Sequence, residues 1–119
     1  MHELRIAQEI IAIVGNEMRQ RRLVNATEIG LRLGPLSGVD SEALSFSFKA
    51  AVADSSLEQA ELVITHVPVK ATCRDCGKDV DIQDFFFFCP SCESPDVDVI
   101  EGDELEVSYI IADEDHDHA

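Results

Sequence analysis

The 119-residue chain is poor in basic residues, with nine lysines and arginines against 24 aspartates and glutamates. The resulting formal charge of −15 repels phosphate backbones, so the composition excludes nucleic acid as the default partner and favours cationic ones. No apolar run approaches the roughly 20 residues that a membrane-spanning helix needs. The first residues lack the basic start and apolar stretch of a signal peptide, so we expect a cytoplasmic protein without a membrane partner.

Chemical motifs of enzymes are also missing from the chain. We find no nucleophile–base pair, no phosphate-binding loop and no metal motif that leaves a coordination position open. We therefore expect a binding or carrier protein rather than an enzyme.

Apolar periodicity predicts two helices, over residues 3–22 and near residues 41–53. Residues that recur at three- and four-residue steps mark their buried faces: Ile6, Ile10, Ile13, Val14 and Met18 in the first helix, and Leu44, Phe48 and Ala51 in the second. Asp40 stands where the N-cap of the second helix is expected, and Phe46 falls outside the buried face.

Strands are predicted at residues 29–33, 61–70, 97–100 and 105–111. The order of elements predicts an α+β fold, with two helices on a three-stranded mixed sheet and a cysteine module inserted before the last strand. The predicted domains are 1–70 plus 95–111 as one discontinuous domain, 71–94 as the cysteine module, and 112–119 as an acidic, disordered tail.

Four cysteines form two pairs of the type Cys-x2-Cys, Cys73 with Cys76 and Cys89 with Cys92, separated by twelve residues. A two-residue gap lets one tight turn direct two thiolates at one ion, and two such turns complete the tetrahedron that zinc prefers. Gly77 and Pro90 supply turn residues at the two pairs. The spacing predicts a closed structural Zn(II) site with no position left for water or substrate.

The cysteines have two other interpretations. Disulfides or free thiols are disfavoured in a reducing cytoplasm, and a redox role for one pair leaves the second pair unexplained. The apolar run Phe85–Phe88 leads into the second pair. It is predicted as a strand that packs the small module, and the alternative is an exposed surface that binds a partner.

The start of the chain carries a second candidate metal site. The Met1 amine, the backbone nitrogen and imidazole of His2, and the amide or carboxylate of Glu3 can close fused chelate rings. A planar set of nitrogen donors favours Ni(II) or Cu(II). The alternative is a surface histidine at a frayed helix start. His66, and His116 and His118 in the acidic tail, form no specific site in this interpretation.

Three segments together resemble the HypA/HybF family of nickel metallochaperones. They are Met1-His2-Glu3 before an amphipathic helix, residues 34–48 (GPLSGVDSEALSFSF), and the paired Cys-x2-Cys motifs followed by residues 102–105 (GDEL). Their order and spacing cover residues 1–111. The sequence departs from the family at Ser41, where many relatives have proline, and in the histidine-containing acidic tail.

The resemblance implies a nickel-binding α+β domain with an inserted zinc domain, and Ni(II) as cargo. Its nickel site would use Met1, His2 and Glu3, while Asp40 matches a position that takes part in nickel binding in some members. The four cysteines would hold zinc. The implied partners are a HypB-type maturation GTPase and the large subunit of [NiFe]-hydrogenase, and some relatives also supply urease. The alternative function is a zinc-ribbon interaction module without nickel-carrier activity.

Overall fold

The computed structural model describes residues 2–83 and 85–115. They divide into two compact units. Unit 1 contains the described residues of 1–31, 39–65 and 106–119, and unit 2 contains those of 32–38 and 66–105. Unit 2 therefore includes the predicted cysteine module and flanking segments on both sides of it. No helix within the described ranges is long and apolar enough to cross a bilayer.

Helix α1 (His2–Arg21) opens unit 1 and confirms the first predicted helix. Its buried residues are Ile6, Ala7, Ile10 and Val14. Ile13 was predicted in this set, but it is 52% exposed. It lies about 100° around the helix from Val14, at the margin of the apolar face, so only its neighbour reaches the core.

Helix α2 (Ser41–Val52) confirms the second predicted helix, and Asp40 is its N-cap. Leu44, Phe48 and Val52 are buried, at steps of four residues. Phe46 lies off this stripe as predicted and is 76% exposed.

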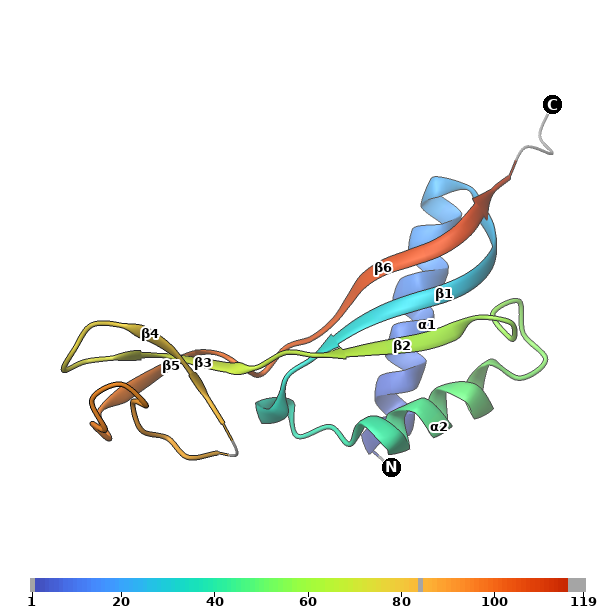
Figure 1. Ribbon diagram of the computed structural model, residues 1–119. Coiled ribbons are helices and arrows are strands. Elements are labelled where there is room, and N and C mark those ends of the chain that lie inside the picture. Colours follow the sequence, from blue (N-terminus) through green and yellow to red (C-terminus); the bar gives the residue numbers. More distant parts are fainter. Residues whose placement is uncertain (1, 84, 116–119) are drawn as a thin grey trace. The chain divides into compact units, whose positions relative to one another are not determined.

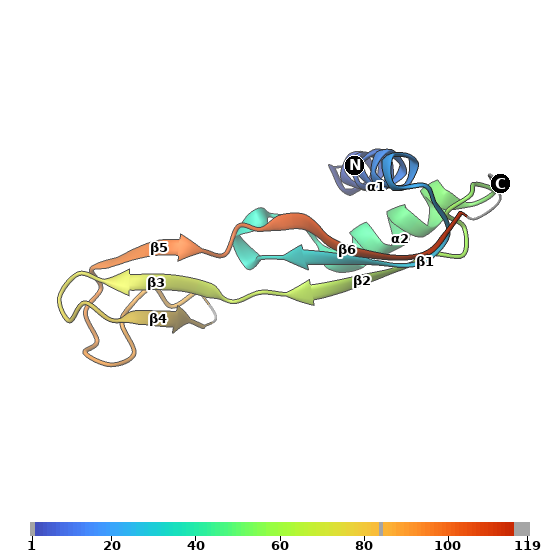
Figure 2. The same ribbon diagram turned by 90° about the horizontal axis from the view of Figure 1, so that it is seen from above.

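The sheet of unit 1 has the strand order β2-β1-β6, formed by β1 (Leu23–Leu33), β2 (Glu61–His66) and β6 (Leu105–Glu114). Strands β1 and β2 run in the same direction and β6 runs against them, so the sheet is mixed as predicted (Figure 2). The apolar core of the unit joins the two helices to one face of this sheet (Figure 1).

Unit 2 is built on an antiparallel sheet of order β4-β3-β5, formed by β3 (Val69–Cys73), β4 (Asp79–Ile82) and β5 (Val97–Glu101). Its core of buried apolar side chains is small, comprising Val69, Ala71 and Ile82, with Val80 and Val97 packed against them. A 3-10 turn, η1 (Pro35–Ser37), completes the unit.

The predicted strand over residues 61–70 is wrong, because the chain forms two strands there, β2 and β3. Residues 67 and 68 belong to neither strand. Pro68 has no N–H to donate to a ladder, so it interrupts the extended run.

The run Phe85–Phe88 is also not a strand, and it lies in a loop after β4. Phe85 has a φ of 61°, outside the extended region that a strand requires.

The last strand is longer than predicted. Strand β6 includes residues 112–114, which were expected to belong to the acidic tail. His116 and His118 lie outside the described residues.

The close approach of Gly34 to Gly102 allows a test of the packing within unit 2. A Cβ on Gly34 would lie 2.1 Å from the carbonyl oxygen of Gly102, and that oxygen accepts a hydrogen bond of 2.7 Å from the N–H of Leu36. Because backbone cannot move aside as a flexible side chain can, we expect Gly34→Ala to lower the free energy of unfolding by about 1–3 kcal/mol.

The matched control is Gly15→Ala in α1, where a Cβ meets only the Arg19 Nη1 atom at 3.4 Å. This change should raise the free energy of unfolding by up to about 1 kcal/mol, since alanine favours a helix over glycine. Urea unfolding followed by far-ultraviolet circular dichroism measures both variants. An unchanged Gly34→Ala midpoint would contradict the proposed close approach.

Candidate metal centres

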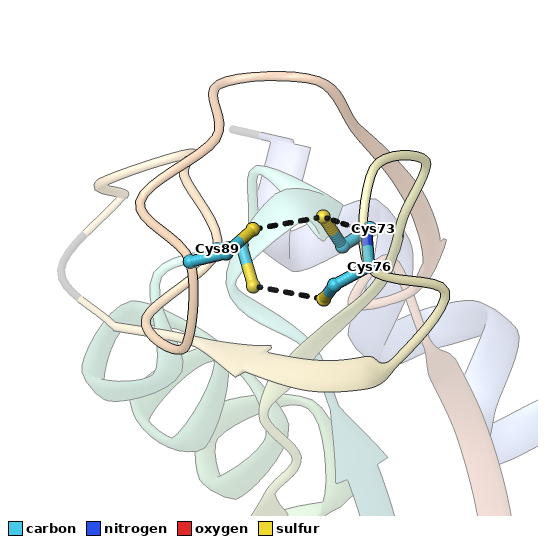
Figure 3. A group of neighbouring side chains, drawn as sticks. Cys73, Cys76 and Cys89 are labelled. Atoms are coloured by element: carbon cyan, nitrogen blue, oxygen red, sulfur yellow. Dashed lines mark hydrogen bonds between the residues drawn. The ribbon is translucent and has the colours of Figure 1, made fainter.

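The four cysteines of unit 2 converge (Figure 3). Their sulfur atoms all lie within 4.8 Å of one another. Cys73 is the last residue of β3, Cys89 directly follows the loop residues Phe85–Phe88, and both cysteines are buried. Cys76 and Cys92 are exposed. The sequence spacing therefore does bring the two pairs to one place.

The first Cys-x2-Cys turn is closed by backbone hydrogen bonds around Cys73. Its N–H donates to the Lys78 carbonyl at 2.9 Å, and its carbonyl accepts from the Gly77 N–H at 2.9 Å. The N–H of Cys76 also donates to the Cys73 sulfur at 3.4 Å. Gly77 has a φ of 74°, which suits glycine at this turn.

The second turn repeats this pattern around Cys89. Its N–H donates to the Ser94 carbonyl at 2.8 Å, and its carbonyl accepts from the Glu93 N–H at 2.7 Å. Glu93 occupies the position of Gly77 and also has a positive φ, of 63°. The two turns thus present their sulfurs in the same way, although only one has glycine at the left-handed position.

The sulfur separations test which chemistry fits the cluster. Cys73 and Cys92 sulfurs lie 3.6 Å apart, and Cys76 and Cys89 sulfurs 3.7 Å apart. A tetrahedron with zinc–sulfur bonds of about 2.3 Å has edges of roughly 3.8 Å, whereas a disulfide needs about 2.05 Å. The four residues fit a tetrathiolate zinc site, in which zinc would supply a structural crosslink and no open position for a reaction.

The thiols of the cluster differ in acidity. Backbone N–H groups of Cys92 and Ser91 donate to the Cys89 sulfur and lower the pKa of that thiol to about 7. At Cys92 the Ser94 N–H acts in the same direction, but hydrogen bonds with Cys73 and the other thiols raise the pKa of Cys92 to about 12. Once one thiol is ionised, its negative charge disfavours ionisation of the neighbouring thiols. A divalent cation would offset the repulsion between the thiolates, and its binding would release the remaining thiol protons.

A second set of contacts joins the two turns without using the cysteines. The Ser94 hydroxyl donates to the Asp75 carboxylate and accepts from the Asp96 N–H at 3.1 Å. Arg74 makes two hydrogen bonds to the Asp98 carboxylate, at 2.8 and 2.6 Å. Both residues between Cys73 and Cys76 therefore bind the segment after the second turn. Sequence reasoning missed these residues, because single polar residues in a motif carry no spacing signal.

At the start of α1, the structure places Glu3 beside Asp40. The Glu3 Oε2 atom accepts a hydrogen bond of 3.2 Å from the Asp40 backbone N–H. This bond is the main reason that the pKa of Glu3 lies below its usual value, so the carboxylate stays ionised in mild acid. The contact brings together two residues that are far apart in sequence and that the family resemblance assigned to one site.

Asp40 confirms its predicted role as a helix cap. Its Oδ1 atom accepts from the Glu42 N–H at 2.9 Å and the Ala43 N–H at 3.2 Å. Any role in metal binding would therefore come in addition to capping α2.

His2 is exposed in the first turn of α1, and Met1 lies outside the described residues. Among the residues that the structure describes, the cysteines are the one group of three or more His, Cys, Asp or Glu whose ligand atoms lie close enough to hold an ion. Within the described residues, Glu3 therefore contacts Asp40, but His2 does not form a group of close ligand atoms with them. His66, at the end of β2, is exposed and belongs to no such group.

The fold and the cysteine cluster define a class, that of small α+β metal-binding proteins with a four-thiolate module. A family model described as "Hydrogenase/urease nickel incorporation, metallochaperone, hypA" matches residues 1–112. The chain belongs to this family, which confirms the resemblance inferred from the sequence.

Curated relatives and solved structures agree with this assignment. The hydrogenase maturation factor HypA of Chlorobaculum parvum is 40% identical over 110 residues, covering 92% of this chain and 97% of the relative. That of Geobacter metallireducens is 38% identical with the same coverage. The solution structure of the Ni metallochaperone HypA from Helicobacter pylori matches with a TM-score of 0.68 at 18% identity, over 95% of this chain and 98% of that chain. That structure shares the fold.

The Ser94 contacts predict a measurable effect on metal retention. Ser94→Ala removes the bond to Asp75 and the acceptor for the Asp96 N–H, while all four thiols remain. A hydrogen bond contributes about 0.5–1.5 kcal/mol, so we expect zinc release to a chromophoric chelator to accelerate between about twofold and tenfold.

The control is Ser91→Ala, which changes an exposed serine inside the second turn. Its release rate should equal that of the unmodified chain. Equal rates for both variants would show that the Ser94 contacts do not hold the turns together.

Proposed function

We propose that this chain is a nickel carrier that binds Ni(II) at its N-terminus and delivers it for maturation of [NiFe]-hydrogenase. The observation that carries the proposal is the family match over residues 1–112, because that family is described by nickel incorporation. The matched relatives are named hydrogenase maturation factors, which favours hydrogenase over urease as the destination.

The proposed nickel ligands are the Met1 amine, the backbone nitrogen and imidazole of His2, and Glu3, with Asp40 beside them. The first N–H groups of an α-helix have no partner within the helix, so a metal can displace these amide protons without breaking its hydrogen-bond ladder. The hydrogen bond from the Asp40 N–H to the Glu3 carboxylate supports placing the two residues beside each other at this site.

Such a site suits a carrier. Planar nitrogen donors select Ni(II) by geometry, and a site at the end of the chain can be opened from one side by an acceptor. Protons compete for the imidazole and amine nitrogens, so nickel affinity should fall as the pH becomes acidic.

Unit 2 has a different task in this proposal. Cys73, Cys76, Cys89 and Cys92 hold one structural Zn(II), and unit 1 carries the nickel ligands. With all four zinc positions filled by thiolates, the zinc would have no catalytic role. The family description as a metallochaperone supports a carrier rather than an enzyme. A site of four zinc-binding thiolates persists in a reducing compartment, which supports a cytoplasmic location.

The proposed partners are a HypB-type GTPase and the hydrogenase large subunit. The family description supports partners in hydrogenase maturation in general. The formal charge of −15 opposes nucleic acid as a partner.

Nickel titration of protein with an authentic N-terminus tests the proposal. We expect about one tightly bound Ni(II) per chain and a visible absorption band of a planar complex, because nitrogen donors of this kind favour that geometry. Acetylation of the amine or His2→Ala should abolish the band. Tight nickel binding that survives both changes would refute an N-terminal site.

Two substitutions at Asp40 separate its capping role from metal ligation. Asparagine caps helices about as well as aspartate, whereas alanine costs about 0.5–2 kcal/mol. If Asp40 is a ligand, Asp40→Asn should weaken nickel binding while leaving thermal stability unchanged, and Asp40→Ala should reduce both. If Asp40→Asn leaves the nickel affinity unchanged, Asp40 serves as the N-cap of α2 and is not a nickel ligand.

A further inference from the structure

Four consecutive phenylalanines, Phe85–Phe88, lie in the loop directly before Cys89 and are between 39% and 62% exposed. None of them belongs to the apolar core of unit 2. Large apolar side chains stabilise a fold mainly through burial, so each of these four leaves part of that contribution unused. We call Phe85–Phe88 the phenylalanine loop.

The rings are arranged in two pairs on the loop. Phe85 and Phe87 have ring centroids 6.3 Å apart, and so do Phe86 and Phe88. Phe86 and Phe88 line a hollow of about 280 Å³ together with Asp81, Gln83 and Pro90. One pair thus forms the wall of a concave site large enough for an apolar side chain.

The backbone of the loop is held in an unfavourable conformation. Phe85 adopts a φ of 61°, which is rare for a bulky residue. The N–H of Phe86 donates to the Gln83 carbonyl at 2.9 Å, and that turn fixes how the rings follow one another. Strained backbone of this kind is often found where a surface is used for binding.

Charge indicates what kind of partner fits the hollow. Unit 2 has ten aspartates and glutamates against four lysines and arginines. Asp98 is paired with Arg74 and Asp79 accepts a hydrogen bond from Thr72. Asp81 lines the hollow and stands opposite Lys70 in the register of β3 and β4. A carboxylate beside apolar rings, in a unit with this acidic excess, favours an apolar group flanked by positive charge.

We propose that the phenylalanine loop and its hollow are a docking surface for a segment of another protein that carries an apolar side chain flanked by lysine or arginine. Aromatic rings supply contact area, and Asp81 supplies orientation and specificity. A second copy of this chain is a poor occupant, because it would bring two chains of formal charge −15 together.

The test uses the full zinc-loaded chain and two fluorescent peptides with the same central leucine and phenylalanine. One peptide is flanked by lysines and the other by glutamates. We expect fluorescence anisotropy to show binding of the basic peptide, weakened by salt, with the acidic peptide at least tenfold weaker. No binding of the basic peptide, or equal binding of both peptides, would overturn the proposal.

Variants locate the binding on the loop. Phe86→Ser combined with Phe88→Ser should lower the affinity for the basic peptide at least tenfold. Asp81→Asn should lower this affinity severalfold and make it less dependent on salt. Phe46→Ser is the matched control, since Phe46 is an exposed phenylalanine of unit 1 and should leave binding unchanged. Zinc content and circular dichroism check that each variant is folded.

Two results would overturn the assignment of the surface. One is binding that survives the double change or falls equally in Phe46→Ser. The other is concentration-dependent dimerisation that the double change abolishes, which would make the occupant a second copy. Nickel titration of the same variants keeps this proposal separate from the carrier function, because the phenylalanine loop is not part of the nickel site.

Discussion

The four cysteine sulfurs of unit 2 converge beside a small apolar cluster, whose buried members among the described residues are Val69, Ala71 and Ile82. Full burial of a valine or isoleucine side chain contributes about 1.5–3 kcal/mol, and ordering the backbone opposes it at about 1–2 kcal/mol per residue. A structural zinc ion in a small module contributes about 10–16 kcal/mol. With zinc bound, the cysteine cluster would therefore stabilise unit 2 more than this apolar cluster does.

Unit 1 has the opposite character, because its two helices and mixed sheet share a substantial apolar core. That core fixes the starts of α1 and α2, and the Asp40 N–H then reaches the Glu3 carboxylate. In the proposed carrier, the donor sets are chemically distinct. Nitrogen and oxygen atoms at the chain start suit Ni(II), and four thiolates suit Zn(II), so each ion has its own kind of site.

Local patterns predicted the features that depend on local physics. Helix periodicity gave α1 and α2, capping preference gave Asp40, and the spacing of the cysteines predicted their cluster. Features that depend on tertiary context were missed. The extension of β6 depends on pairing with its neighbouring strand, and an apolar run such as Phe85–Phe88 does not by itself distinguish a buried strand from an exposed loop. The interruption at Pro68 was also missed, although the missing N–H of proline is a local signal.

In the proposed carrier, nickel and zinc occupy chemically different sites in one chain. X-ray absorption spectroscopy at the nickel and zinc edges, on protein with an authentic N-terminus loaded with both metals, distinguishes the two sites. We expect only nitrogen and oxygen ligands around nickel, and four sulfurs around zinc. Sulfur ligands in the nickel spectrum would contradict this expectation, because they would place the cargo ion in the cysteine cluster.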